Sequence, residues 1–341
     1  MFQNRISVTG IVAAAFVACS TAALCAPAKM NAIVQTGPGV EKMQLQSVDT
    51  PRPGPNQVLM KVYAAGVNPV DWKRIPATTT LTSGSVLPPI PGFDASGVVD
   101  GVGAGVTAFK TGDAVVARVT GAFAQYAVVN VEDLAPKPRA FTFIQAGAMP
   151  IAGVAGFATV VAADVKAGQR VAIIGAAGGA GSAAVDIVHG RGAKVIASGH
   201  SSQGAWLKEQ HVEDFVAYDK EKVASRIKDV DAVLNMADGQ AEAALAYVKR
   251  GGHLASIAGI ASGDKCAAAG VTCTQIRGTA PGMTAGESLR AISKLADEGK
   301  YTPRVTKTFP LAQAAAAQRV AHVGDSVGKV VLIVDPKARD R

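Results

Sequence analysis

A glycine-rich segment between two apolar runs constrains the fold of this chain more than any other feature. It reads RVAIIGAAGGAGSAAVDIVHGRGAKVIAS, which predicts a buried strand (170–174), a glycine turn (175–181), a helix from Ser182 and a second strand (193–198). Glycines permit a sharp turn and a close approach to a pyrophosphate, and a helix N-terminus offers free N–H groups to that anion. Within a βαβ unit, such a turn is a specific signal for a dinucleotide. We assign to cofactor binding Gly175, Ala177, Gly178, Gly179, Ala180 and Gly181.

The end of the second strand predicts which nicotinamide cofactor is bound. An NAD site places an acidic residue about 20 residues after the glycines, where it binds the ribose 2′-hydroxyl. This chain reads SGHSS at 198–202, and no acidic residue follows until Glu209. Hydroxyls, an imidazole and backbone N–H groups suit a 2′-phosphate, so we expect NADPH, recognised by Ser198, Gly199 and His200. A polar loop that binds nothing is the alternative interpretation.

Two kinds of pattern divide the rest of the chain. From Met30 to about residue 148, short apolar or alternating runs separated by Pro/Gly turns indicate β-structure. From about Phe143 to residue 282, helical stretches alternate with apolar runs such as DAVLNM and HLASIAG, which is typical of βαβ units on a parallel sheet. A helix, a strand, an Ala-rich helix from Leu311 and a last strand, GKVVLIVD, follow. With 341 residues, 49% of them hydrophobic, the chain is long enough for two domains.

Residues 1–28 have the composition of a signal peptide. Arg5 precedes a mostly apolar stretch (6–26), and Ala26-Pro27-Ala28 offers a small-x-small cleavage site. We therefore expect a periplasmic or secreted protein. A mis-set start is the alternative, because a chain beginning at Met30 would be cytoplasmic. The cysteines of this segment leave lipidation open, although neither has the usual Leu three residues before it.

Charge and cysteine usage exclude several function classes. The net charge of +8 is scattered, with no Lys/Arg run that contains interleaved aromatics, so an anionic cofactor is a more economical partner than nucleic acid. No stretch after the N-terminal segment is both long and apolar enough to span a bilayer. Cys266 and Cys273 are the cysteines that remain after cleavage. In an exported protein they can form a disulfide, and two buried free thiols are the alternative.

Several motifs occur in the order found in one enzyme family. They are AAGVNPVDWKRI, PGFDASGVVDGVGAGVTAFKTGDAVVA, GAFAQYAVV, GAAGGAGSAAVDIV, GGHLASIAG and GKVVLIVD. Together, from Met30 to Pro336, the chain resembles the zinc-independent quinone oxidoreductases of the medium-chain dehydrogenase/reductase superfamily. The resemblance implies an α/β protein with a GroES-like β-barrel catalytic domain (29–148 and 286–341). A Rossmann domain with a doubly wound parallel sheet (149–285) would bind NADP.

The resemblance also implies an enzyme without a metal. Zinc-dependent relatives have a Cys where this chain has Asn68, and Gly-His-Glu where it has Gly92-Phe93-Asp94. Their lobe of four clustered cysteines is missing as well. Since thiolate and imidazole are the ligands that zinc prefers, we expect no catalytic zinc.

Further site residues follow from the same resemblance. Asn68 matches an Asn near the nicotinamide, where its amide would donate a hydrogen bond to a carbonyl that gains negative charge. A turn-forming Asn before Pro69 is the alternative. Asp71, which we also assign to the catalytic set, would order that loop. Tyr218 matches a Tyr at the adenosine phosphate end, and Ala258, in GGHLASIAG, joins the cofactor-binding set. The family's usual basic residue in the second-strand loop is absent, which weakens the assignment of NADPH more than that of a dinucleotide.

The chemistry implied is hydride transfer from NADPH to a quinone or to an α,β-unsaturated carbonyl. Two alternatives remain open. One is a reductase of another carbonyl or of an enoyl thioester, and the other is an exported nucleotide-binding redox module with little turnover. No Ser/His/Asp or Cys/His set with catalytic spacing argues for nucleophilic catalysis. The resemblance leaves a homodimer open, and the sequence does not name the substrate.

Overall fold

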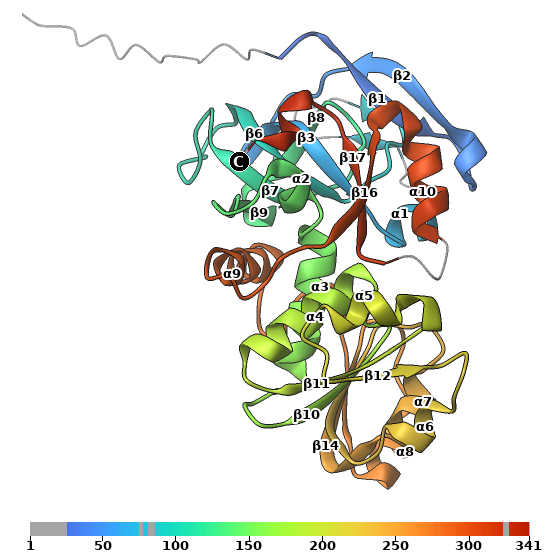
Figure 1. Cartoon of the computed structure of the whole chain (residues 1–341). Coiled ribbons are helices and arrows are strands. Elements are labelled where there is room, and N and C mark those ends of the chain that lie inside the picture. Colours follow the sequence, from blue (N-terminus) through green and yellow to red (C-terminus); the bar gives the residue numbers. More distant parts are fainter. Residues whose placement is uncertain (1–25, 75–77, 81–85, 323–326, 341) are drawn as a thin grey trace, which may run out of the picture.

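The computed structural model describes residues 26–74, 78–80, 86–322 and 327–340. Most of the predicted signal peptide lies outside these residues. Figure 1 shows two halves, one built on a parallel sheet and the other on a curved, mostly antiparallel sheet.

The parallel sheet lies in the middle of the chain. Its strand order is β12-β11-β10-β13-β14-β15, and every pairing in it is parallel. The order reverses between β10 and β13, which creates the crevice where doubly wound sheets bind ligands. The strands are β10 (Arg170–Ile174), β11 (Lys194–Gly199), β12 (Asp214–Ala217), β13 (Val230–Asn235), β14 (Val248–Ser256) and β15 (Thr272–Gln275). The helices of this half are α3 (Pro150–Ala162), α4 (Gly179–Gly190), α5 (Gly204–Lys208), α6 (Val223–Arg226), α7 (Ala241–Leu245), α8 (Gly263–Ala269) and the 3₁₀ turn η3 (Ser201–Gln203).

The other half combines both ends of the chain. β17, near the C-terminus, pairs antiparallel with β3, and the sheet order is β16-β17-β3-β6-β7-β9, with β8 also on β3. Its strands are β3 (Gln57–Val67), β6 (Asp94–Val102), β7 (Ala114–Arg118), β8 (Tyr126–Asn130), β9 (Leu134–Pro136), β16 (Val305–Pro310) and β17 (Lys329–Ile333). Two further antiparallel pairs are β1 (Lys29–Gln35) with β2 (Met43–Asp49), and β4 (Thr79–Thr80) with β5 (Val86–Leu87). The helices are α1 (Val70–Lys73), α2 (Phe143–Gly147) and α10 (Ala314–His322).

This architecture confirms the predicted fold class, a GroES-like barrel with a Rossmann-type parallel sheet. Helix α9 (Ala285–Asp297) packs against both α3 and β9, so it contacts both halves. It begins at a capping box, in which the Thr284 hydroxyl accepts from the N–H of Glu287 and the Glu287 carboxylate accepts from Thr284. The chain therefore leaves the parallel sheet through a helix with a fixed start.

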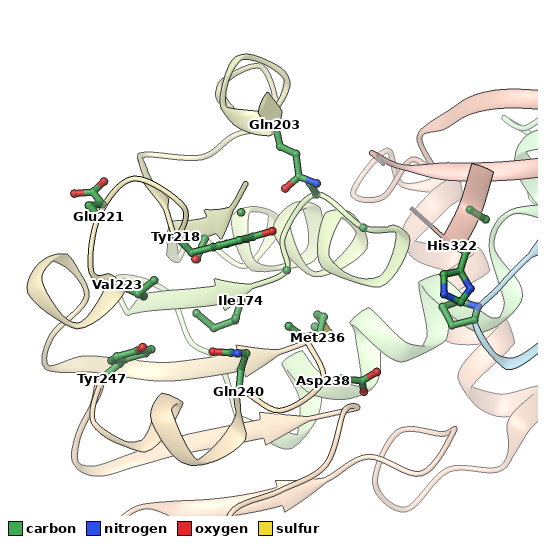
Figure 2. Close-up of a pocket in the computed structure, with 18 of the residues that line it drawn as sticks. Ile174, Gln203, Tyr218, Glu221, Val223, Met236, Asp238, Gln240, Tyr247 and His322 are labelled. Atoms are coloured by element: carbon green, nitrogen blue, oxygen red, sulfur yellow. The ribbon is translucent and has the colours of Figure 1, made fainter. Parts of the chain in front are cut away.

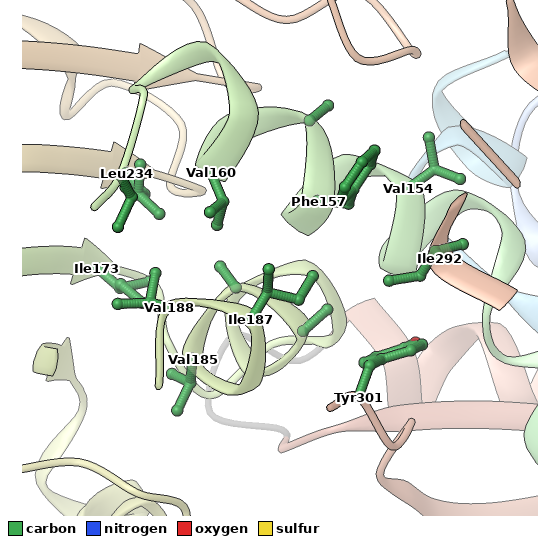
Figure 3. Close-up of a cluster of buried hydrophobic side chains, with 14 of the residues drawn as sticks. Val154, Phe157, Val160, Ile173, Val185, Ile187, Val188, Leu234, Ile292 and Tyr301 are labelled. Atoms are coloured by element: carbon green, nitrogen blue, oxygen red, sulfur yellow. The ribbon is translucent and has the colours of Figure 1, made fainter. Parts of the chain in front are cut away.

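The core that fixes the cofactor loop lies between α3, α4 and the first strands of the parallel sheet. Figure 3 shows Phe157 of α3 together with Val185 and Ile187 of α4, and all three side chains are buried. The two helices approach closely at Gly156, where an added Cβ would lie 2.6 Å from the carbonyl oxygen of Ala180. Truncating Phe157 to Ala would cost about 3–5 kcal/mol, because the packed helices cannot close the cavity. The start of α4 is therefore held by packing.

Candidate active site

A cleft of about 1070 Å³ lies between the two halves. One wall is formed by the carboxyl ends of β10, β11 and β13 with the segments that follow them, and the other by α1 and the end of α10. Figure 2 shows Tyr218 and Met236 on the first wall and His322 on the second. The rings of Trp72 of α1 and His322 are in contact, with centroids 4.9 Å apart and an angle of 35° between their planes. A cleft at a switch point, bounded by a second domain, is a common place for a cofactor and its substrate.

The glycine turn has the geometry that a pyrophosphate needs. Gly175 follows β10 with a φ of 78°, which a residue with a side chain rarely adopts. Gly178 is the N-cap of α4 and has no side-chain cap, so the first N–H groups of the helix stay available to an anion. At Gly181 an added Cβ would lie 2.2 Å from the Gly175 carbonyl oxygen, so only glycine lets helix and strand pack here. The loop therefore fits a dinucleotide.

The structure brings most of the predicted cofactor residues to this cleft. Gly175, Ala177, Gly178, Ser198, Gly199 and Tyr218 line it. Gly179, Ala180 and Gly181 form the first turn of α4 behind them. His200 and Ala258 do not line the cleft. The Ala258 N–H donates to the Ser256 hydroxyl at 3.2 Å, in the segment after β14.

The far end of the cleft lies over β11 and β12. Tyr218 keeps 54% of its surface exposed, and its ring makes an edge contact with His200, with centroids 6.0 Å apart. Lys222 also lines this end. Ser198 is buried, and its carbonyl oxygen accepts from the N–H groups of Gly175 and Ala176. Ser198 therefore shapes the turn through its backbone, while Tyr218 and Lys222 are accessible to a ligand.

This region also contains an acidic residue that the sequence patterns did not predict. Asp219 accepts from both the N–H and the hydroxyl of Ser201, each at 2.7 Å, and lies 3.5 Å from the His200 Nε2. These bonds from Ser201, with the nearby His200, lower the pKa of Asp219 to about 2. The acid was sought along β11, but it comes from the end of the neighbouring strand β12. Because β11 and β12 are parallel, their carboxyl ends meet at one edge, and the strand order would have revealed the contact.

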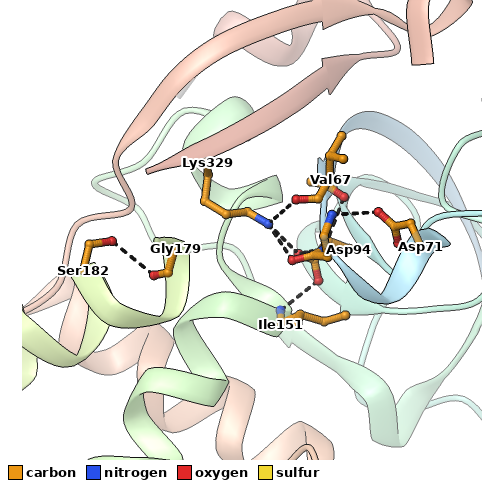
Figure 4. A network of polar contacts seen from close by, with 9 residues as sticks. Val67, Asp71, Asp94, Ile151, Gly179, Ser182 and Lys329 are labelled. Atoms are coloured by element: carbon orange, nitrogen blue, oxygen red, sulfur yellow. Dashed lines mark hydrogen bonds and ion pairs between the residues drawn. The ribbon is translucent and has the colours of Figure 1, made fainter. Parts of the chain in front are cut away.

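A buried polar network lies where the second wall meets the glycine turn (Figure 4). The Lys329 ammonium donates to the Asn68 Oδ1 at 2.6 Å and to the Val67 carbonyl oxygen at 2.7 Å, and it lies 3.7 Å from the Asp94 Oδ2. The Asn68 amide donates to the Asp94 Oδ2 at 2.8 Å and to the Gly66 carbonyl oxygen at 3.3 Å. The Ile151 N–H donates to the other Asp94 oxygen at 2.8 Å. This network joins β3, β6, α3 and β17.

The arrangement of Asn68 differs from the predicted role. We expected its amide to donate to a substrate carbonyl, but it is 2% exposed, does not line the cleft, and directs its donors to Gly66 and Asp94. Since the ammonium of Lys329 can only donate, it fixes the Asn68 oxygen toward itself and the amide nitrogen away. In this structure Asn68 therefore organises the loop, and a direct contact with substrate would need these bonds to break.

Asp71 orders the same loop. Its Oδ2 accepts from the Asn68 N–H at 2.7 Å, while its Oδ1, which is buried, has no hydrogen-bond partner. Burial raises the pKa of Asp71 well above its usual range and also raises the pKa of Asp94. Burial lowers the pKa of Lys329, against the pull of the two carboxylates. The network therefore concentrates two acids and one base where water does not reach them.

Lys329 was not predicted from the sequence as a site residue. The motif that contains it, GKVVLIVD, was used only for the resemblance, although a lysine that begins an otherwise apolar buried strand is itself a signal. In the part of the chain that the structure describes, no group of three or more His, Cys, Asp or Glu side chains is placed to bind a metal ion. Among the same residues, no helix has the length and apolar character required to cross a membrane.

Comparisons with known proteins agree with this architecture. Residues 54–139 match the family described as alcohol dehydrogenase GroES-like domain, and residues 210–332 match the family described as zinc-binding dehydrogenase. The chain is 31% identical over 314 residues to the quinone oxidoreductase of Sus scrofa, covering 87% of this chain and 95% of the relative. It is 30% identical over 318 residues to a chloroplastic NADPH-dependent alkenal/one oxidoreductase of Arabidopsis thaliana, covering 87% and 78%. The solved quinone oxidoreductase from Coxiella burnetii superposes with a TM-score of 0.78 at 27% identity, covering 90% of this chain and 99% of that one.

Proposed function

The chain belongs to the medium-chain dehydrogenase/reductase family, within its quinone oxidoreductase group, and on this premise we propose that it transfers hydride from NADPH to a quinone or an α,β-unsaturated carbonyl without zinc. The nicotinamide cofactor supplies the hydride. The protein binds the dinucleotide, orients its reactive end in the cleft and keeps water from the buried side.

The observation that carries the proposal is the cleft itself. Its first wall presents an uncapped helix N-terminus at Gly178 and the accessible ring of Tyr218, which fit a pyrophosphate and an adenosine. Its second wall presents the Trp72 and His322 rings, tilted by 35° to each other, which offer aromatic surface to a planar conjugated substrate. A hydride donor bound on the first wall would therefore face a substrate bound on the second.

The preference for NADPH is supported by charge at the adenosine end. Lys222 lines that end, and His200 lies beside it. Asp219 opposes the preference, because a carboxylate repels a 2′-phosphate. However, the Ser201 donors, His200 and Lys220, whose Nζ lies 3.6 Å away, already compensate its charge. We therefore propose that the Lys222 ammonium binds the 2′-phosphate of NADPH.

Zinc independence is supported by the buried ammonium of Lys329. In the zinc-dependent relatives, the positions of Asn68 and Phe93 carry the Cys and His ligands, and here Lys329 places a positive charge against Asn68 and against Asp94, which follows Phe93. A second cation beside the ammonium would be repelled. The match to the family described as zinc-binding dehydrogenase covers residues 210–332, which contain neither Asn68 nor Phe93.

A substrate screen tests the proposal. Oxidation of NADPH is followed in a stopped-flow instrument with quinones, enones, saturated aldehydes and enoyl thioesters at matched concentrations. The proposal predicts the highest kcat/KM for quinones or enones. A higher kcat/KM for an enoyl thioester or a saturated aldehyde would favour a reductase of those substrates instead. If none of the compounds is reduced, a nucleotide-binding redox module is favoured.

We also propose that the protein is exported. The proposal rests on the composition of residues 1–28, with Arg5 before an apolar stretch that ends in small residues. The N-terminal sequence of the protein recovered from its cells tests it, because cleavage near Ala28 is expected.

A further inference from the structure

Lys329 is a buried base that hydride transfer does not use, and it lies beside the cleft. It is 6% exposed, and its ammonium donates hydrogen bonds to two oxygen atoms and lies 3.7 Å from a third. We call these atoms the oxygen cage: the Val67 carbonyl oxygen, the Asn68 Oδ1 and the Asp94 Oδ2. A set of carbonyl, amide and carboxylate oxygens is the coordination environment of hard divalent cations.

The cage contains one carboxylate, Asp94, whose negative charge the Lys329 ammonium balances. Asp71 lies behind the cage through the Asn68 N–H. Both carboxyl groups are buried, and the Asp71 Oδ1 has no partner. Removing the ammonium would leave an uncompensated buried carboxylate, which is strongly unfavourable unless another cation enters or a proton binds.

Lys329 also connects the cage to the cofactor loop. Its stem packs against Gly179, where an added Cβ would lie 2.5 Å from the lysine Cδ. The preceding residue, Gly328, donates its N–H to the Ala177 carbonyl oxygen at 2.8 Å and forms a β-bridge with Gly178. On the other side, the cage belongs to the loop that leads directly into α1, which lines the second wall. One side chain therefore bridges the glycine turn and the substrate wall (Figure 4).

We propose that the Lys329 ammonium occupies an oxygen cage that would otherwise bind a divalent cation. By occupying the cage, it fixes the position of the second wall of the cleft relative to the glycine turn. Lys329 is thus a positioning residue, acting through Asn68 and Asp94. The positioning role rests on the proposed function, whereas the occupancy of the cage does not. The two can therefore fail separately.

Metal binding tests the occupancy of the cage. Lys329→Ala is titrated with MnCl₂, and bound Mn²⁺ is measured by the loss of its free electron paramagnetic resonance signal. We expect the variant to bind one Mn²⁺ at least tenfold more tightly than the wild type, and the added substitution Asp94→Asn to abolish that gain. A folded Lys329→Ala variant that binds Mn²⁺ no better than the wild type would overturn the proposal.

If Lys329→Ala does not fold in the absence of metal, the occupancy of the cage is tested through its stability. In that case its thermal transition is followed in MnCl₂ and in choline chloride at equal ionic strength. A cooperative transition restored by Mn²⁺ alone supports the cage, and the same behaviour in both salts overturns it.

Positioning is tested with a matched pair of buried lysines. Lys137 is 9% exposed and donates to the carbonyl oxygens of Pro138 and Phe141 at 3.0 and 2.5 Å, outside the cleft. Lys329→Met should lower kcat about a hundredfold through misplacement of the reacting groups, with partial rescue by methylammonium in Lys329→Ala. Lys137→Met should lower only the melting temperature. Equal kcat in both variants would overturn the positioning role. Absence of turnover in the wild type would instead count against the proposed function, and the Mn²⁺ titration would still decide the cage.

Discussion

Lys73 of α1 and Asp238, in the segment after β13, form an ion pair across the cleft, with 2.8 Å between Nζ and Oδ2. Both residues line the cleft, and both side chains are largely exposed. The pair therefore contributes little to stability, about 0–1 kcal/mol. Its position matters more, because it connects the two walls between which a cofactor and a substrate enter.

Breaking this pair should change ligand exchange more than folding. For Lys73→Ala we expect faster release of NADPH, by about two- to fivefold if the pair contributes its usual fraction of a kcal/mol to the closed cleft. Stopped-flow displacement measures the release rate. Lys29→Ala is the control, since the exposed Lys29–Asp49 pair, at 2.7 Å, lies within one hairpin. Identical release rates in both variants would show that the Lys73 pair does not hold the cleft closed.

Two substitutions at the adenosine end should shift the cofactor preference in opposite directions. Lys222→Ala should weaken NADPH binding about ten- to a hundredfold, the usual effect of one charge-assisted contact, and leave NADH nearly unchanged. Asp219→Asn keeps an acceptor for Ser201 but removes a negative charge, so NADPH should bind severalfold more tightly. Fluorescence titrations with both cofactors measure these affinities. A large loss of NADH affinity in Asp219→Asn would instead place the carboxylate on a ribose hydroxyl and reverse the assignment.

The fold could be predicted from the sequence because the patterns that indicate it lie within short, continuous segments. The strand at 170–174, the glycine turn and the helix after it follow one another in the chain, so periodicity and glycine spacing predict them directly. The closing strand, GKVVLIVD, was also predicted, and the structure places it at 329–333 as β17.

The candidate site could be predicted less completely from the sequence, because its contacts join segments that are distant in the chain. Lys329 meets Asn68 across 261 residues, and Asp219 meets Ser201 across 18. The resemblance drew attention to Asn68 and Asp71 but not to Lys329, whose ammonium fixes the direction of the Asn68 side-chain amide. Side-chain direction at such a site depends on which strands pair, and the local pattern of one segment does not contain that information.

Chelation tests zinc independence. If the Lys329 ammonium provides the positive charge of the network, purified enzyme should contain no stoichiometric zinc and should keep its turnover after dialysis against a strong chelator. Elemental analysis and NADPH oxidation on the same sample measure both. Zinc bound at one equivalent and required for activity would contradict the proposed function.

Asp71 should give the folded protein a measurable pH dependence. Since burial raises the pKa of Asp71, the native state keeps a proton that the unfolded chain releases above about pH 4. Relative to Asp71→Asn, wild-type stability should therefore fall as pH rises from about 4 toward the raised pKa, by up to about 1.4 kcal/mol per pH unit. Urea unfolding of both proteins across this range measures the difference. A difference that grows in favour of the wild type with rising pH would mean that the native state stabilises the carboxylate.

The Cys266–Cys273 disulfide should stabilise the folded protein, and its presence in cells depends on the compartment. Cys266 of α8 and Cys273 of β15 are bonded, with Cα atoms 6.2 Å apart, and they close a loop at the edge strand of the parallel sheet. Closing so short a loop restricts the unfolded chain, so replacing both cysteines with serine should lower the free energy of unfolding by about 2–3 kcal/mol. A reductant should destabilise the wild type by a similar amount and leave the double variant unchanged.

Thiol titration in denaturant, on protein recovered from its native compartment, tests whether the disulfide agrees with export, because the bond persists only where thiols are not kept reduced. Two free thiols on a chain that still begins at Met1, or that begins at Met30, would remove both the disulfide and the export proposals.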